Sequence, residues 1–402
     1  MPLITPRRRL LAGAAAIAAG GLLVPACVRA AAGVSGRINI GEHPGGIAAA
    51  IGTGQPLYAP PGVYQLPSGL ALTQPLDLMG DSARPPTFEW GKGDAFIPGA
   101  APVRFQHCKF AAGPGYLVNM NETAVEVPYI GVFDCTFEDV GGVIGWPTTR
   151  PLPGSRLGQL EVRRVDAKNV GRGIVVQGGT TVRFEVEEYS CDGYTRFGLL
   201  IGPIGGRYQA DMVSGTVRHV KVLNGRLKGD ASTSNKNNNN GVYIAGRNVE
   251  LHDVHIENLG DGTRHDTEGL YTKVVHLRAA GVRLVNAGGK QAFYGCKGSD
   301  PKSNRVAGAD TVFENLEIIC AGEHKGNGVW FQAHEGATFA NVRTVGLTGS
   351  ALRMHKSAEG PLIIRDWHDL DGRRTKASVF DLRGRSRVEL ADCTVTPPYA
   401  NV

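Results

Sequence analysis

The chain has 402 residues, of which 56 are glycine, and its formal net charge is +6 at neutral pH. Residues 1–30 contain four arginines and no acidic residue, so the rest of the chain carries 39 basic and 37 acidic residues, a net charge of +2. This balance gives no overall basic field, so we expect no nucleic-acid partner, and any preference for anions must come from local placement of charge.

Residues 1–30 are typical of an export signal. Residues 7–11 (Arg-Arg-Arg-Leu-Leu) resemble a twin-arginine motif, and they lead into an apolar run that ends at Ala26. Small residues favour cleavage of the signal after Ala30. A lipoprotein signal, with a lipid anchor on Cys27, is a poorer match. The run is short for a membrane span and no later stretch is as long. The sequence predicts no transmembrane segment and a bacterial protein exported to the periplasm or the extracellular space.

Ten four-residue segments recur from residue 115 onwards, and each has an apolar or aromatic residue in second place. Gly115-Tyr116-Leu117-Val118 and Gly241-Val242-Tyr243-Ile244 are two of them. Neighbouring segments are 23 to 43 residues apart, and a repeat of about 20–50 residues is typical of solenoids and arrays. Because strand side chains alternate, the second residue of each segment is expected to face a core and the third to face outward. The third residues are Leu117, Ile144, Val175, Leu200, Tyr243, Tyr271, Tyr294, Trp330, Arg353 and Asp381.

A second repeat lies between these segments and consists of Asp, Asn or His followed by alternating apolar residues. Asp134-Cys135-Thr136-Phe137 and Asn315-Leu316-Glu317-Ile318 are examples. Each coil therefore has at least two short β-runs separated by turns. The sequence predicts an all-β protein over residues 31–402, a single-stranded right-handed parallel β-helix (β-solenoid) of about ten or more coils with inserted loops and an N-terminal cap near residues 31–100. Another β-solenoid is also compatible, whereas a propeller blade needs about 40–45 residues.

Two of the cysteines, Cys108 and Cys135, occupy equivalent positions in neighbouring coils. They are expected either to stack as buried thiols or to form a disulfide, and stacked parallel strands favour the thiols. No Cys-x-x-Cys or His/Cys ligand spacing is present, so zinc and redox chemistry are not expected.

The region before the repeats contains residues 57–66 (Leu-Tyr-Ala-Pro-Pro-Gly-Val-Tyr-Gln-Leu) and, further on, residues 76–81. With the coil repeat, these segments resemble the pectate-lyase-like superfamily of right-handed parallel β-helices over roughly residues 38–396. The resemblance implies that a long carbohydrate binds along the outer face of a parallel sheet. The superfamily includes lyases, hydrolases, epimerases, esterases and adhesins, so the fold does not decide the reaction.

The outward column is aromatic in four consecutive coils. Pyranose rings have an apolar face that stacks on tyrosine and tryptophan, and their hydroxyl groups need polar neighbours. We therefore predict a polysaccharide as the partner. The predicted substrate-binding residues are Tyr243, Tyr271, Tyr294, Trp330, Gln332 and His334.

Basic and phenolic groups gather in the same coils, which favours a lyase acting on a uronic-acid polymer. Such a reaction needs a base for the C5 proton, a group that neutralises the carboxylate and an acid for the leaving oxygen. Lys273 is the predicted base, with His355 as a second choice. Residues 268–273 loosely resemble the acid-then-lysine strand of β-helix lyases acting on alginate and dermatan-type chains, although the second acid of their calcium-binding pair is missing. The predicted catalytic residues are Lys273, Tyr271, Arg353, His355, Lys297, Glu268 and Asp266.

Two other functions remain compatible with the sequence. A glycoside hydrolase would use paired carboxylates, which Asp261, Asp266 and Glu268 supply just before Tyr271. The same three acids are the candidate ligands for a calcium ion. A carbohydrate-binding or surface protein without catalysis would need only the aromatic column. The Asn-x-Asp, Asp-Asp and Gly-His-Gly patterns of β-helix galacturonan hydrolases are absent in that form.

Overall fold

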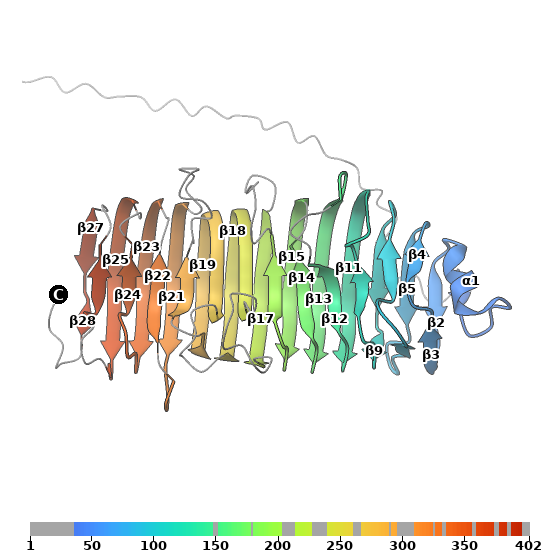
Figure 1. Ribbon diagram of the computed structural model, residues 1–402, viewed down its shortest axis with the longest axis horizontal. Helices are drawn as coiled ribbons and strands as arrows, with labels where there is room; N and C mark the ends of the chain where they lie inside the picture. Colours follow the sequence, from blue (N-terminus) through green and yellow to red (C-terminus); the bar gives the residue numbers. More distant parts are fainter. Residues whose placement is uncertain are drawn as a thin grey trace, which may run out of the picture. The chain divides into compact units, whose positions relative to one another are not determined.

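The computed structural model describes residues 36–147, 152–177, 180–202, 214–226, 239–259, 267–288, 291–295, 309–324, 326–331, 335–355, 359–373, 378–383 and 387–395. These residues form a parallel β-solenoid of the right-handed type with about ten coils, which confirms the predicted fold class. Figure 1 shows the strands of successive coils side by side in sequence order. The predicted export signal lies outside the described residues.

The first coils are built from short strands and one helix. The helix α1 (Gly46–Gly52) follows β1. The predicted cap region thus contains strands that already pair in parallel with later coils, for example β5 with β8. These elements are β1 (Ile38–Asn39), β2 (Leu57–Ala59), β3 (Val63–Leu66), β4 (Leu70–Leu72), β5 (Leu76–Gly80), β6 (Thr87–Trp90), β7 (Phe96–Pro98), β8 (Val103–Gln106) and β9 (Lys109–Ala111).

The later coils each carry three β-segments, one more than the minimum inferred from the sequence. The first sheet is formed by β10 (Tyr116–Asn119), β12 (Gly142–Trp146), β14 (Arg172–Val176), β16 (Phe197–Ile201), β20 (Gln291–Gly295), β22 (Asn327–Phe331), β24 (Leu352–Met354) and β26 (Phe380–Leu382). The long strands that form the second and third sheets are β11 (Glu126–Glu138), β13 (Arg156–Lys168), β15 (Thr180–Asp192), β17 (Ser214–Gly225), β21 (Ala309–Ile319), β23 (Glu335–Val345) and β25 (Glu359–Leu370). β18 (Asn239–Leu259) and β19 (Thr267–Ala287) contribute to all three sheets, and β27 (Val388–Ala391) and β28 (Thr394–Val395) pair with β25.

The turn from the second sheet to the third is a single residue with left-handed backbone, which explains the second sequence repeat. Asp134 has a φ of 53° and Asn315 a φ of 56°. Asn and Asp tolerate this conformation better than most residues. The strand registers stack these residues into what we call the corner column. Its members are His107, Asp134, Arg164, Glu188, His219, Asp253, Gly281, Asn315, Asn341, Asp366 and Asp392.

The register of the first sheet corrects the outward column in its first two coils. Val175 lies opposite Gly145, and Val118 lies opposite Ile144. Leu117 and Ile144 therefore do not continue the outward column, and both are fully buried in the main core. The ring of Tyr116 is the physical reason. A Cβ on Gly142 or Gly145 would lie only 2.2 or 2.5 Å from atoms of that ring, so both positions must be glycine.

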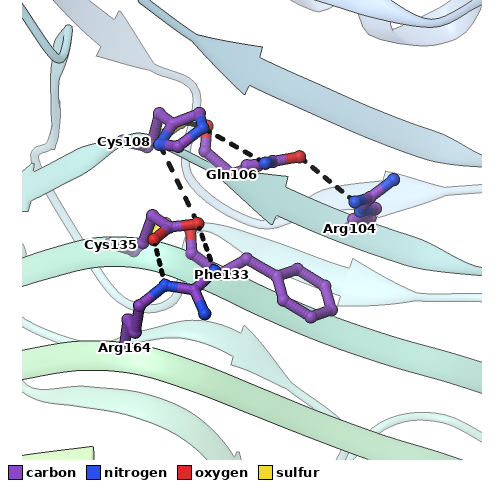
Figure 2. Close-up of polar contacts among 8 residues, drawn as sticks. Arg104, Gln106, Cys108, Phe133, Cys135 and Arg164 are labelled. Carbon is purple, nitrogen blue, oxygen red and sulfur yellow. Dashed lines mark hydrogen bonds and ion pairs between the residues drawn. The ribbon is translucent and has the colours of Figure 1, made fainter. Parts of the chain in front are cut away.

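Aromatic rings and thiols stack along the inside of the solenoid. Phe110 and Phe137 belong to neighbouring coils, and their ring centroids lie 5.0 Å apart. Cys108 and Cys135 are buried free thiols in neighbouring coils, as predicted. Figure 2 shows both cysteines and Arg164. The Arg164 guanidinium donates to the carboxylate of Asp134 at 3.0 Å.

The inserted loop expected at residues 228–240 falls mainly outside the described residues, and in the one expected at residues 321–327 the described residues 321–324 form a short turn. Arg373 holds this turn, because its guanidinium donates to the carbonyl oxygens of Cys320 at 3.2 Å and His324 at 2.7 Å. None of the helices in the described part of the chain has the length and apolarity needed to cross a membrane.

Candidate active site

The outer side of the first sheet carries the predicted outward column from Val175 onwards, and we call this surface the site face. Successive strand pairs align Val175, Leu200, Tyr243 and Tyr271. The column then runs on through positions 294, 330, 353 and 381 in unbroken register. The aromatic column therefore exists as a stack of adjacent positions, one per coil.

The aromatic side chains of the site face form a second hydrophobic cluster, separate from the main core. Its buried members are Val175, Phe197, Leu200, Tyr243, Ala245 and Tyr271, and Trp330 packs against it half-buried. The rings of Tyr243 and Tyr271 meet edge to face with centroids 4.8 Å apart. Tyr243 has no exposed surface and Tyr271 has 6%. Among the described aromatic side chains of the column, Trp330 thus has the most exposed surface.

Lys273 is a buried cation on the site face. It is 4% exposed, and its Nζ lies 5.6 Å from the centroid of the Tyr271 ring. Its position two residues after Tyr271 places both side chains on the same side of β19. A lysine with so little exposure is uncommon, because desolvation penalises its charged form.

Glu268 is also buried, at 4% exposure, near the start of the same strand. Its backbone N–H donates to Oδ1 of the buried Asn240 at 3.3 Å, and it bridges to Gly288. Strand alternation gives Glu268 the same side as the core residue Leu270 and the opposite side from Lys273.

A second polar group lies further along the column, around Trp330. The Arg353 guanidinium lies 5.0 Å from the centroid of the Trp330 ring, and its Nε lies 3.4 Å from Oδ2 of Asp381. Asp381 also pairs with Arg383 at 2.8 Å. The Arg353 side chain keeps 36% of its surface exposed. His355, two residues on, is partly exposed, and its backbone N–H donates to Phe331.

The structure divides the predicted site into two groups rather than one centre. Tyr271 and Lys273 share one coil with Glu268, and Arg353 and His355 stand three coils further on. At about 4.8 Å per coil, this separation is roughly 14 Å. The two groups therefore cannot act on the same sugar ring, but one extended chain can contact both.

Several predicted residues lie outside the described residues: Asp261, Asp266, Lys297, Gln332 and His334. For Tyr294 the structure describes the backbone, which pairs with Tyr271 and Trp330, but not the side chain. Within the described ranges, no group of three or more His, Cys, Asp or Glu side chains could hold a metal ion. The calcium site at Asp261, Asp266 and Glu268 stays a prediction.

The sequence analysis overlooked one group of side chains at the other end of the site face. Tyr116, Arg172, Arg196 and Phe197 gather there, at the beginning of their strands. The sequence does carry a signal for this group, because one arginine opens β14 and another immediately precedes β16, and both strands are otherwise buried. The repeat was compared only at later positions of each segment, so these arginines were missed.

Comparison with known proteins supports the fold alone. No protein-family model and no curated protein matches the chain. The structure is similar to the catalytic domain of GH87 α-1,3-glucanase in complex with nigerose, with a TM-score of 0.52 and 11% identity over 91% of this chain and 70% of that one. It is more distantly similar to the Azotobacter vinelandii mannuronan C-5 epimerase AlgE6 A-module, with a TM-score of 0.41 and 12% identity over 88% and 94% of the two chains. A third match is PfbA, a surface adhesin of Streptococcus pneumoniae, at a TM-score of 0.34 and 11% identity over 86% and 84%. The chain has a parallel β-helix fold.

Proposed function

We propose that the protein is an exported polysaccharide-active enzyme that cleaves a uronic-acid-containing chain by β-elimination on the site face. The observation that carries the proposal is the burial of Lys273 against Tyr271, on a face lined mainly by aromatic side chains. Desolvation in general disfavours the charged form of a lysine, and the free amine is the form that a general base needs.

In the proposed reaction, Nζ of Lys273 takes the C5 proton of the uronate. The electron pair of the C5–H bond forms the C4–C5 double bond, and the C4–O bond breaks with its electrons on the leaving oxygen. Tyr271, whose ring lies beside the Lys273 amine, donates its phenolic proton to that oxygen. The carboxylate of the reacting sugar requires a cation nearby, for which the sequence offers Arg353 or Lys297. Arg353 stands three coils away, so Lys297 is the residue we propose.

Trp330 and Arg353 form a binding subsite for another sugar of the same chain in this proposal. The indole offers a face for stacking, and the exposed guanidinium offers paired donors to a carboxylate. Trp330 lies two coils and Arg353 three coils from Tyr271, which suits an extended polymer better than a small molecule.

A glycoside hydrolase is the second candidate, and two observations favour it. Glu268 is a buried carboxylate on the strand that carries Lys273, although on the opposite side of it. The glucanase of similar fold is in complex with nigerose. This alternative needs a second carboxylate, for which Asp261 and Asp266 are the predicted residues.

The deciding experiment incubates the protein with uronic-acid polymers and follows ultraviolet absorbance and new reducing ends together. Elimination creates a conjugated, absorbing uronate, whereas hydrolysis creates reducing ends without it. We expect absorbance from the wild type and from Lys221→Ala, an exposed lysine on another face, and none from Lys273→Ala. Reducing ends without absorbance establish the hydrolase, and binding without either signal establishes a binding protein.

A further inference from the structure

The end of the site face that precedes the aromatic cluster carries two arginines that have no acidic partner among the described residues. Arg172 opens β14, and Arg196 immediately precedes β16. The register places Arg172 opposite Phe197, so the two arginines belong to neighbouring coils. Both side chains are half-buried.

Aromatic rings hold the two guanidinium groups in place. The Arg172 guanidinium lies 5.9 Å from the centroid of the Tyr116 ring and donates to the Tyr116 hydroxyl at 2.8 Å. The Arg196 guanidinium lies 5.5 Å from the centroid of the Phe197 ring. Tyr116 and Phe197 are themselves buried, with 7% and 3% of their surface exposed. The positions of both cations are therefore fixed by packing.

The charges of this pair are not balanced within the described part of the chain. Neither Arg172 nor Arg196 has a carboxylate within ion-pair distance there, and the Nε of Arg196 is buried without a hydrogen-bond acceptor. The carboxylate of Asp94, in the preceding coil, already accepts from the Tyr116 N–H and the Asn119 side chain. Burial, and then the nearby Arg172 charge, lower the pKa of Arg196. Two like charges in a partly desolvated place are unfavourable unless an anion joins them.

An arginine on the second sheet shows the usual arrangement. Arg163 lies 2.8 Å from Glu161, 3.1 Å from Glu185 and 3.9 Å from Glu187. There the chain supplies its own carboxylates, Glu161 on the same strand and the other two in the next coil. Opposite Arg172, the two adjacent coils supply Gly142 and Phe197 instead.

We propose that Arg172 and Arg196, with the hydroxyl of Tyr116, form a subsite for an anionic group on the bound polysaccharide. Guanidinium groups bind planar and tetrahedral oxyanions through paired N–H donors, so a uronate carboxylate and a sulfate ester both fit. This inference rests on the proposed function in one respect, namely that a polysaccharide occupies the site face.

The position of the subsite agrees with an extended ligand. Phe197 belongs to the same hydrophobic cluster as Tyr243 and Tyr271. From the coil of Leu200 to that of Tyr271 is two coil steps, or about 10 Å. Lys273 then lies between this subsite on one side and Arg353 on the other. A polymer that contacts both cationic ends must carry anionic groups on sugars either side of the reacting one.

The test measures binding by calorimetry in the Lys273→Ala background, so that no ligand is consumed. The ligands are a polyuronate without sulfate, a sulfated galactan without uronate and a neutral glucan of the same length. We expect Arg196→Met to weaken polyuronate binding roughly 10- to 100-fold, as for the loss of a charge-assisted hydrogen bond. Arg196→Lys keeps the charge and recovers part of the affinity. Arg218→Ala, an exposed arginine of the second sheet, is the matched control and changes nothing.

The outcomes separate this subsite from the proposed reaction. A loss seen with the sulfated galactan in place of the polyuronate identifies a sulfate ester as the anion and supports the subsite. Unchanged affinity in Arg172→Met and Arg196→Met, each with wild-type thermal unfolding, overturns it, whatever the turnover of the wild type. Binding of the neutral glucan alone also overturns it. Absence of turnover together with arginine-dependent binding overturns the lyase and leaves the subsite standing.

Discussion

Substitution of Tyr243 tests whether the second hydrophobic cluster, on the site face, contributes to the stability of the solenoid. Tyr243 points away from the main core, yet it has no exposed surface and packs edge to face on Tyr271. Truncation of a buried aromatic side chain costs about 3–5 kcal/mol of unfolding free energy. The edge-to-face contact accounts for about 0.5–1.5 kcal/mol of that value. We therefore expect Tyr243→Ala to lose about 3–5 kcal/mol and Tyr243→Leu to lose less.

Urea unfolding followed by circular dichroism measures the change, with the slope m compared between variants. Trp330→Ala is the contrast in the same column, because Trp330 is only half-buried and should cost about 1–2 kcal/mol. Since each coil contacts only its neighbours, hydrogen exchange of the β18 and β19 amides shows whether the loss is local. A loss below about 1 kcal/mol in Tyr243→Ala, with m unchanged, would refute the reasoning that burial of the second hydrophobic cluster stabilises these coils.

The remaining expectations concern binding, the corner column, the thiols and acid stability. Trp330→Ala should weaken polysaccharide binding while the circular dichroism spectrum stays unchanged, and equal affinity in calorimetry would remove the stacking role. Asn315→Ala should be less stable than Asn315→Gly by about 1–2 kcal/mol, because alanine resists the left-handed backbone found there while both variants lose the hydrogen bond from Asn341. Equal urea midpoints for the two variants contradict this. Burial raises the pKa of Cys108, and that of Cys191 to about 12, so mass spectrometry after treatment with a thiol reagent near neutral pH should find Cys393 modified before either of them. The hydrogen bond from Arg164 lowers the pKa of Asp134, so this pair stabilises the fold above the unfolded-state pKa and ceases to do so as pH falls through the folded-state pKa. Arg164→Ala should therefore be less stable than wild type by about 0.5–1 kcal/mol at neutral pH, with the difference vanishing in strong acid.

Sequence reasoning predicted the solenoid because its two repeats have direct physical causes. The alternation of Leu270 and Tyr271, or of Val329 and Trp330, reflects one side facing the core and the other facing out. The Asp and Asn positions of the second repeat reflect a left-handed residue at each corner. Arg164 and Glu188 adopt the same backbone although neither residue type signals it. Their conformation follows from the strands on both sides, and residue type alone does not reveal it.

The register of the first coils could not be obtained from the repeat. The segment of residues 142–146 has two glycines, and alignment on the first one puts Ile144 outside. The observed register instead puts Gly145 outside, where the Tyr116 ring needs the space. For the candidate site, the spacing of the repeat placed Tyr271 and Lys273 on one face with Arg353 a few coils further on, and the strand register agrees. The spacing did not reveal that Tyr271 and Lys273 are buried on that face, because burial depends on the packing of neighbouring side chains.

The corner column has a consequence for how the chain avoids misassembly. Its first six residues alternate between basic and acidic side chains, from His107 to Asp253. Arg164 lies 2.5 Å from Asp134, and His219 lies 3.2 Å from Asp253. Coils of similar shape can stack on the wrong neighbour during folding, and skipping one coil would bring Asp134 against Glu188. The alternation makes two of these skipped stackings, Asp134 on Glu188 and Glu188 on Asp253, contacts of like charges, so it favours adding each coil in its proper order while the solenoid grows.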